Sequence, residues 1–128
     1  MASGGAVGSV LRYLLSGATQ RWFAVATGAM TALPVGTLFV NVSGSLLIGL
    51  FAGLAESRVL QGADAWLLLV VGVLGGYTTF SAFSLETFVL LRAGQPLTAL
   101  GSVLLQLVLG LGAAFAGYSA GIAAGRPV

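Results

Sequence analysis

The sequence predicts an all-α membrane protein, built as a single domain of four transmembrane helices over residues 1–128. Hydrophobic residues make up 58% of the chain and charged residues only 6%, whereas a soluble domain carries roughly a quarter charged residues. Several stretches approach the ~20 consecutive apolar residues that a transmembrane helix needs. Such a chain cannot cover a water-exposed surface with polar groups. We therefore expect a multi-pass protein of the cell's inner (plasma) membrane.

The first apolar stretch, residues 2–16, is short for a transmembrane helix and contains Arg12. We expect it to cross the membrane either with help from neighbouring helices or with residues that precede Met1. Residues 17–33 are mixed in polarity and rich in Gly, Thr and Ala. This composition predicts a connection, in part helical, between the first and second helices.

The remaining three helices are predicted over residues 35–55, 65–91 and 97–124. Each contains enough apolar residues to cross the hydrocarbon core. Pro34 and Pro96 stand at the starts of the second and fourth helices, where a missing N–H group does no harm.

The third predicted helix is interrupted near its middle by Gly72, Gly75 and Gly76. The stretch from Gly75 to Thr79 is the predicted break, because glycines loosen a helix and release its carbonyl groups. Irregular backbone at membrane depth is tolerated only where it is buried in protein or lines a wet cavity. Two interpretations stay open. The break is either a simple glycine kink or a set of carbonyl ligands for a hard cation such as Na⁺, completed by a second, antiparallel chain.

The inventory of chemical groups excludes most kinds of site. Neither Cys nor His occurs, so disulfides, zinc sites and catalysis by Cys or His are excluded. The five basic residues form no cluster, and we expect no binding to nucleic acid. These residues offer no nucleophile–base pair, so an enzyme is not expected.

The arginines near the helix ends are balanced between the two sides of the membrane. With four spans, Arg58 and Arg126 share one side, and Arg21 and Arg92 share the other. The positive-inside rule orients a protein through an imbalance of such charges, and two against two gives none. We therefore expect the chain to insert in both orientations and to pair head-to-tail as an antiparallel, dual-topology homodimer.

Glycines spaced four residues apart predict close helix packing in lipid. These pairs are Gly4/Gly8, Gly49/Gly53, Gly72/Gly76, Gly117/Gly121 and Gly121/Gly125. Four short helices enclose little interior of their own, so we expect a pathway or site to form between chains.

Polar side chains at membrane depth are costly, about 2.5–3.5 kcal/mol for a charged residue at a helix centre, and they are usually functional. Arg12 either extends to the interface, attracts anions or acts as a structural clamp. Thr37, Asn41 and Ser45 follow at intervals of four residues, so they share one face of the second helix. The Asn41 amide carries two donors. It serves either as a helix–helix contact or as a donor to something that crosses the bundle.

Phe80 and Phe83 lie on one side of the second half of the third helix. Packing is the default role of such rings. The flanking hydroxyls of Ser81 and Ser84 favour a further role, because the positive edge of an aromatic ring can face an anion. Glu86 follows one turn later, and its carboxylate would repel an anion at close range. We therefore expect Glu86 to accept hydrogen bonds from hydroxyls or to lie at a pore mouth.

In the fourth helix, Ser102 and Gln106 form a weaker polar stripe, for which a packing role is an equally good explanation. Taken together, the intramembrane polar residues are mostly hydrogen-bond donors and ring edges. A cation pathway would use rings of acids or carbonyls, so a pathway lined with donors suits a small anion. The residues alone therefore indicate an anion-conducting membrane protein but do not identify the ion.

Three segments, GGAVGSVLRY, PVGTLFVNVSGSLLIG and GVLGGYTTFSAFSLE, closely resemble in order and spacing the CrcB/Fluc family of fluoride channels. The resemblance covers nearly the whole chain. It implies four-helix subunits in an antiparallel dimer, with two fluoride pathways near the subunit interface and a central structural Na⁺. It also implies passive export of toxic fluoride from the cytoplasm, with membrane lipid and a second copy of the chain as partners.

The same resemblance gives expected roles to residues in these motifs. Asn41 resembles the pore asparagine of the family, and Phe80 and Phe83 resemble the paired phenylalanines whose ring edges face fluoride. Gly75 and Thr78 look like the backbone-carbonyl ligands of Na⁺, contributed by both subunits. The other residues of the implied fluoride pathway are Thr37, Ser81, Ser84, Arg12 and Glu86.

The chain departs from the family pattern in its short first stretch and at Ala82, where the commoner TTFSTFS form has a threonine. Two rival functions stay open. The first is a small multidrug-type exporter of organic cations, which would need an acid deep in the first helix, whereas the membrane acid here, Glu86, is on the third. The second is a non-transporting assembly subunit whose polar residues only pack helices.

Overall fold

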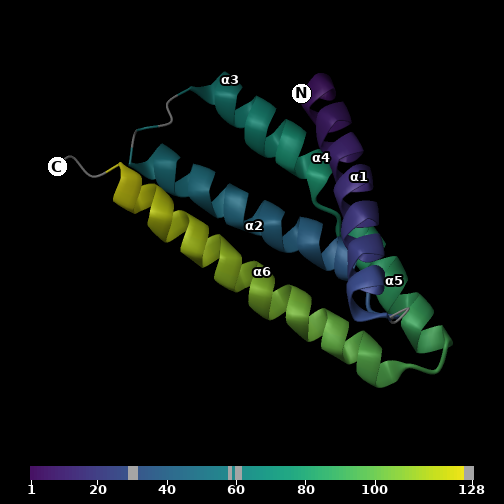
Figure 1. Cartoon of the computed structure of the whole chain (residues 1–128). Coiled ribbons are helices and arrows are strands. Elements are labelled where there is room, and N and C mark those ends of the chain that lie inside the picture. Colours follow the sequence, from purple (N-terminus) through teal and green to yellow (C-terminus); the bar gives the residue numbers. More distant parts are fainter. Residues whose placement is uncertain (29–31, 58, 60–61, 126–128) are drawn as a thin grey trace.

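The computed structural model describes residues 1–28, 32–57, 59 and 62–125, and the regular structure within them is helical. Figure 1 shows the arrangement. The elements in chain order are α1 (Ala2–Thr27), α2 (Val35–Glu56), α3 (Ala63–Trp66), the π-helical η1 (Leu67–Leu74), α4 (Gly75–Tyr77), α5 (Phe80–Arg92) and α6 (Pro96–Ala124).

Within the described residues, three helical segments are long and apolar enough to cross a membrane: Val35–Glu56, Ala63–Arg92 and Pro96–Ala124. They correspond to the second, third and fourth predicted helices, with ends that differ by at most two residues. The chain is therefore all-helical and has the composition of a multi-pass membrane protein.

The predicted end of the first helix, at residue 16, is wrong. α1 continues through 26 residues to Thr27 and ends at Gly28, whose φ of 64° closes the helix. At 1.5 Å per residue it measures about 39 Å, more than the ~30 Å hydrocarbon core. Its second half resembles a loop in sequence because polar residues interrupt it. One of them, Gln20, contacts the start of α2. The backbone N–H of Gly36 donates to Gln20 Oε1 (3.0 Å).

The break in the third helix lies in the last two residues of the predicted stretch, Gly75 to Thr79. Gly75 and Gly76 are helical, and the extended residues are Thr78 and Thr79, with ψ of 159° and 118°. Gly76 instead permits close packing, because a Cβ added there would lie 2.5 Å from the carbonyl oxygen of Gly5 in α1. The wide π-helical turns of η1 were not predicted from the sequence.

α2 and α6 run side by side and parallel (Figure 1). They pair with a constant offset of 65 residues, since Asn41 bonds Gln106 and Gly49 faces the backbone of Ala114 (106 − 41 = 114 − 49 = 65). The predicted four-residue glycine spacings mark the closest approaches. Gly49 and Gly53 pack on the segment of α6 that contains Gly117 and Gly121, while Gly4 and Gly8 pack on η1 and α4.

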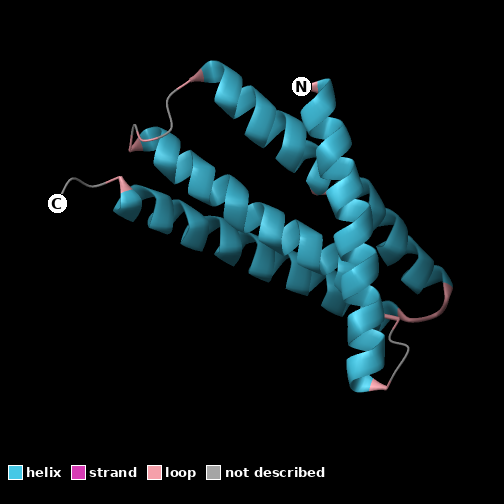
Figure 2. Cartoon of the chain, turned by 45° about the horizontal axis from the view of Figure 1, so that its top comes forward, coloured by secondary structure: helices cyan, strands magenta, loops and turns pink. Residues whose placement is uncertain are grey.

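The helix ends gather at two ends of the molecule. Figure 2 shows the N-terminus, the start of α3 and the end of α6 toward one end, and the end of α1 and the α5–α6 turn toward the other. Arg92 closes α5, and Arg21 lies exposed on α1 rather than in a connection. Arg58 and Arg126, on which the predicted charge balance also depends, lie outside the described residues.

Candidate functional site

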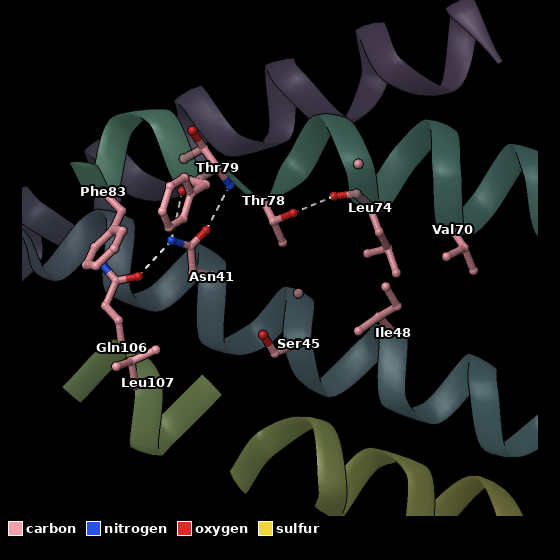
Figure 3. Close-up of a pocket in the computed structure, with 13 residues that line it drawn as sticks. Asn41, Ser45, Ile48, Val70, Leu74, Thr78, Thr79, Phe83, Gln106 and Leu107 are labelled. Carbon is pink, nitrogen blue, oxygen red and sulfur yellow. Dashed lines mark hydrogen bonds between the residues drawn. The ribbon is translucent and has the colours of Figure 1, made fainter. Parts of the chain in front are cut away.

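A cavity of about 370 Å³ lies between α2, the broken third helix and α6 (Figure 3). Its polar wall comes from α2, the two extended threonines and α6, and aromatic rings from α5 close one side. The lining residues are Asn41, Gly44, Ser45, Ile48, Val70, Leu74, Gly75, Thr78, Thr79, Phe80, Phe83, Gln106 and Leu107. All of them are uncharged, and several are polar although the cavity lies in the middle of the apolar segments.

Asn41 holds the break through its side-chain amide (Figure 3). Its Oδ1 accepts from the backbone N–H of Thr79 (2.9 Å), and its Nδ2 donates to the Thr79 carbonyl (3.1 Å). The same Nδ2 also donates to Gln106 Oε1 (2.7 Å). Asn41 therefore replaces helix hydrogen bonds that the break removes, and it ties α2 to α6 at the same level.

Thr79 starts the second half of the broken helix. Its Oγ1 accepts from the backbone N–H of Ala82 (3.1 Å), which is the geometry of an N-cap. The hydroxyl also lies 3.2 Å from Ser81 Oγ. Thr78 sits on the other side of the break, and its hydroxyl donates back to the Leu74 carbonyl (3.0 Å). The two threonines thus terminate one helix and begin the next.

Phe80 and Phe83 form a ring pair at the edge of the cavity, with centroids 5.5 Å apart and planes tilted by 53°. Phe80 is 78% exposed in the single chain. A tilted pair presents ring edges as well as ring faces to its surroundings, and the edges carry the positive end of the aromatic quadrupole.

A second cavity, of about 290 Å³, lies beside the first, between α1, α2 and α5. The Thr37 hydroxyl donates to Glu86 Oε1 there (2.6 Å), so Glu86 does accept from a hydroxyl. Arg12 lines the same cavity, and Thr79 lines both cavities. The wall between the two spaces is therefore the break itself.

Three buried polar atoms have no hydrogen-bond partner among the described residues: Glu86 Oε2, Ser102 Oγ and Gln106 Nε2. Ser102 is 1% exposed and stands level with Thr37 in the 65-residue register of α2 and α6. An unpaired buried donor is costly in a protein interior. Gln106 Nε2 is such a donor, and its residue lines the larger cavity.

The structure thus brings together most of the residues singled out from the sequence. The larger cavity collects Asn41, Phe80, Phe83, Gly75 and Thr78, and the smaller one collects Thr37, Arg12 and Glu86. Ser81 and Ser84 line neither cavity and are exposed on the single chain. Thr79 was overlooked as a functional residue. Its signal was available, because a threonine directly before an apolar helical run is a preferred N-cap.

Comparisons with known proteins identify the family of the chain. The sequence profile of the family described as "CrcB-like protein, Camphor Resistance (CrcB)" matches residues 1–118. A protein of Nitrobacter winogradskyi named "Fluoride-specific ion channel FluC" is 47% identical over 117 residues, which cover 91% of this chain and 88% of the relative. Another, with the same name, from Aquifex aeolicus is 44% identical over 121 residues, or 94% of this chain and 93% of the relative.

A third such protein, from Rhizobium meliloti, is 44% identical over 119 residues, covering 93% of this chain and 90% of the relative. These relatives are named as ion channels and not as enzymes, as predicted. Because the family profile matches almost the whole chain and these relatives match over nearly their full length, the chain belongs to the CrcB-like family.

Proposed function

We propose that the chain is the subunit of a fluoride-selective ion channel that lets fluoride leave the cytoplasm passively. The names of the relatives supply the identity of the ion. The observation that carries the proposal is the uncharged cavity lined by amide and hydroxyl side chains, among them Gln106, whose buried Nε2 has no partner among the described residues. A small, strongly hydrated anion needs several donors at once to replace its water, and a pathway lined with donors supplies them.

We place the fluoride pathway along the break, with contributions from both cavities. Asn41 and Gln106 offer amide groups, Phe80 and Phe83 offer ring edges, and Thr37 and Glu86 form the hydrogen-bonded pair beyond Thr79. Arg12 would attract the anion into the smaller cavity. Ser81 and Ser84 join the pathway through the second subunit, toward which their exposed hydroxyls would turn.

The working unit of this proposal is an antiparallel, dual-topology homodimer with two pores, in which α1 serves as the fourth transmembrane helix of each subunit. The length of α1 and the exposure of Phe80 support it. Tags on both termini, read by accessibility from each side of the membrane, test the orientation. A population in which every copy has the same orientation would contradict the dimer model.

We place a structural Na⁺ at the dimer centre, held by the carbonyl oxygens of Gly75 and Thr78 from both subunits. The residues fit this ion. Among the hydrogen bonds of the described residues, none ends on either carbonyl oxygen, and carbonyl oxygens are suitable ligands for a hard cation. The ion would hold the two breaks together at the centre of the membrane.

Fluoride efflux from liposomes tests the channel. Purified protein is reconstituted in sodium-containing buffer, valinomycin clamps the voltage, and electrodes follow fluoride and chloride in parallel. We expect rapid fluoride loss without chloride loss, and no fluoride loss from the Asn41→Ala variant assembled as a dimer. Ser119→Ala is the matched control, since that hydroxyl only donates to the Phe115 carbonyl of its own helix (2.9 Å). Equal flux through wild type and Asn41→Ala would remove Asn41 from the pathway.

A further inference from the structure

We propose that Asn41 and Thr79 are positioning residues that create the cation site, because their side chains withdraw N–H donors from the carbonyls of Gly75 and Thr78. This inference rests on the proposed function, which makes those two carbonyls the Na⁺ ligands. It assigns to Asn41 a role in cation binding in addition to its place beside the anion.

The first diverted donor is the backbone N–H of Thr79. In a continuous α-helix the N–H of residue i+4 donates to the carbonyl of residue i, so Thr79 would donate to Gly75. Here that N–H donates to Asn41 Oδ1 instead (2.9 Å). Thr79 is 8% exposed, so water does not compete for the group. The Gly75 carbonyl is free because Asn41 has taken its donor.

The second diverted donor is the backbone N–H of Ala82, which in a continuous helix would donate to Thr78. It donates to Thr79 Oγ1 (3.1 Å), and the Thr78 carbonyl is left without a hydrogen bond from the described residues. Asn41 also donates to the Thr79 carbonyl (3.1 Å). This bond stabilises the extended conformation that separates the two helices.

Removal of either side chain reverses the effect. Buried backbone N–H groups are almost always paired. Without Asn41 Oδ1, the nearest acceptor along the chain for Thr79 N–H is the Gly75 carbonyl. That carbonyl then accepts a helix hydrogen bond and no longer binds the ion. Without Thr79 Oγ1, Ala82 N–H returns to the Thr78 carbonyl in the same way.

Sodium binding to the purified dimer tests the inference. The protein is prepared in sodium-free N-methylglucamine buffer and titrated with NaCl in a calorimeter, with KCl as the ion control. We expect Asn41→Ala and Thr79→Val each to weaken Na⁺ binding by about 10- to 100-fold, which is the usual effect of losing a partner that orients a metal ligand. Gel filtration and circular dichroism verify that each variant is a folded dimer.

Two variants separate positioning from general damage. Thr79→Ser keeps the hydroxyl for Ala82 N–H, so it is expected to bind Na⁺ almost as tightly as wild type. Gln106→Leu removes the third bond of the Asn41 amide but leaves both of its bonds to Thr79, and it is also expected to keep Na⁺ affinity.

Unchanged Na⁺ affinity in Asn41→Ala would overturn the role of Asn41. If Asn41→Ala does not fold, equal affinities of Thr79→Val and Thr79→Ser overturn the mechanism. A wild-type protein that conducts fluoride but binds no Na⁺ overturns this inference and leaves the channel standing. A wild-type protein that binds Na⁺ but conducts no fluoride overturns the proposed channel and leaves the inference about the cation site standing.

Discussion

Gly76→Ala is expected to destabilise the protein and to lower fluoride flux, because it forces α4 away from α1. A Cβ at Gly76 would lie 2.5 Å from the carbonyl oxygen of Gly5, 3.1 Å from its Cα and 3.2 Å from its carbonyl carbon. Ordinary van der Waals contact begins at 3.4 Å, so the deficit is 3.4 − 2.5 = 0.9 Å. These are backbone atoms of a helix, which cannot rotate aside. Overpacking of this kind typically costs about 1–3 kcal/mol.

Gly5→Ala is the matched control on the other side of the same contact. A Cβ at Gly5 meets no atom within 4 Å in the described structure. Both substitutions replace a helical glycine, so both gain the same ~0.5–1 kcal/mol of helix propensity. The difference between the two variants in free energy of unfolding therefore isolates the steric effect, expected at about 1–3 kcal/mol.

The assay is unfolding by SDS in mixed micelles, followed by far-ultraviolet circular dichroism, together with fluoride efflux from liposomes. Thr78 lies two residues beyond Gly76, so a displaced α4 also moves the break and its cavity. We expect Gly5→Ala to keep wild-type flux and Gly76→Ala to lose most of it. Equal unfolding free energies for the two variants would refute the reasoning, because they would mean that α1 and α4 do not approach as closely as described.

Two further predictions concern the cavities. Phe80→Ile and Phe83→Ile should each reduce fluoride efflux sharply, since an aliphatic side chain fills space but has no positive edge; normal flux in both variants would reduce the rings to packing groups. Thr37→Val should lower the free energy of unfolding by about 1–3 kcal/mol, because it leaves the half-buried Glu86 carboxyl without its only hydrogen bond from the described residues. Thr37→Ser keeps the hydroxyl and should restore the stability, and a variant with serine as unstable as the one with valine would argue against this bond.

The sequence predicted well where a single local property decides the structure. α2 and α6 are uniform apolar runs that begin beside Pro34 and Pro96, and their predicted ends agree within one residue. The predicted end of α1 was wrong because the apolar stretch ends before the helix does. The polar Gln20, which suggested a connection, accepts a hydrogen bond from Gly36, sixteen residues away. Local composition cannot predict such a contact.

In the candidate site, too, local features were predictable and long-range contacts were not. The asparagine and the two phenylalanines are unusual enough in an apolar chain to be noticed singly, and one cavity collects them. The role of Gln106 depends on Asn41, 65 residues earlier, and on the parallel register of α2 and α6. The exact break depends on which N–H groups Asn41 and Thr79 capture. Glycine content alone therefore marked a longer stretch than the two residues that are extended.

The exposed surface beside the larger cavity bears on how the pore is completed. Phe80 is 78% exposed and the neighbouring Ser81 and Ser84 are also exposed, although they belong to a segment apolar enough to span the membrane. The Ser81 hydroxyl lies 3.2 Å from Thr79 Oγ1, but a serine hydroxyl that faces lipid without such a partner is penalised in the hydrocarbon region. In the proposed antiparallel dimer, a second copy would cover this face and supply the missing wall from its own α2 and α6. Each chain would then contribute half of each pore, and balanced arginines would let the two halves insert in opposite orientations.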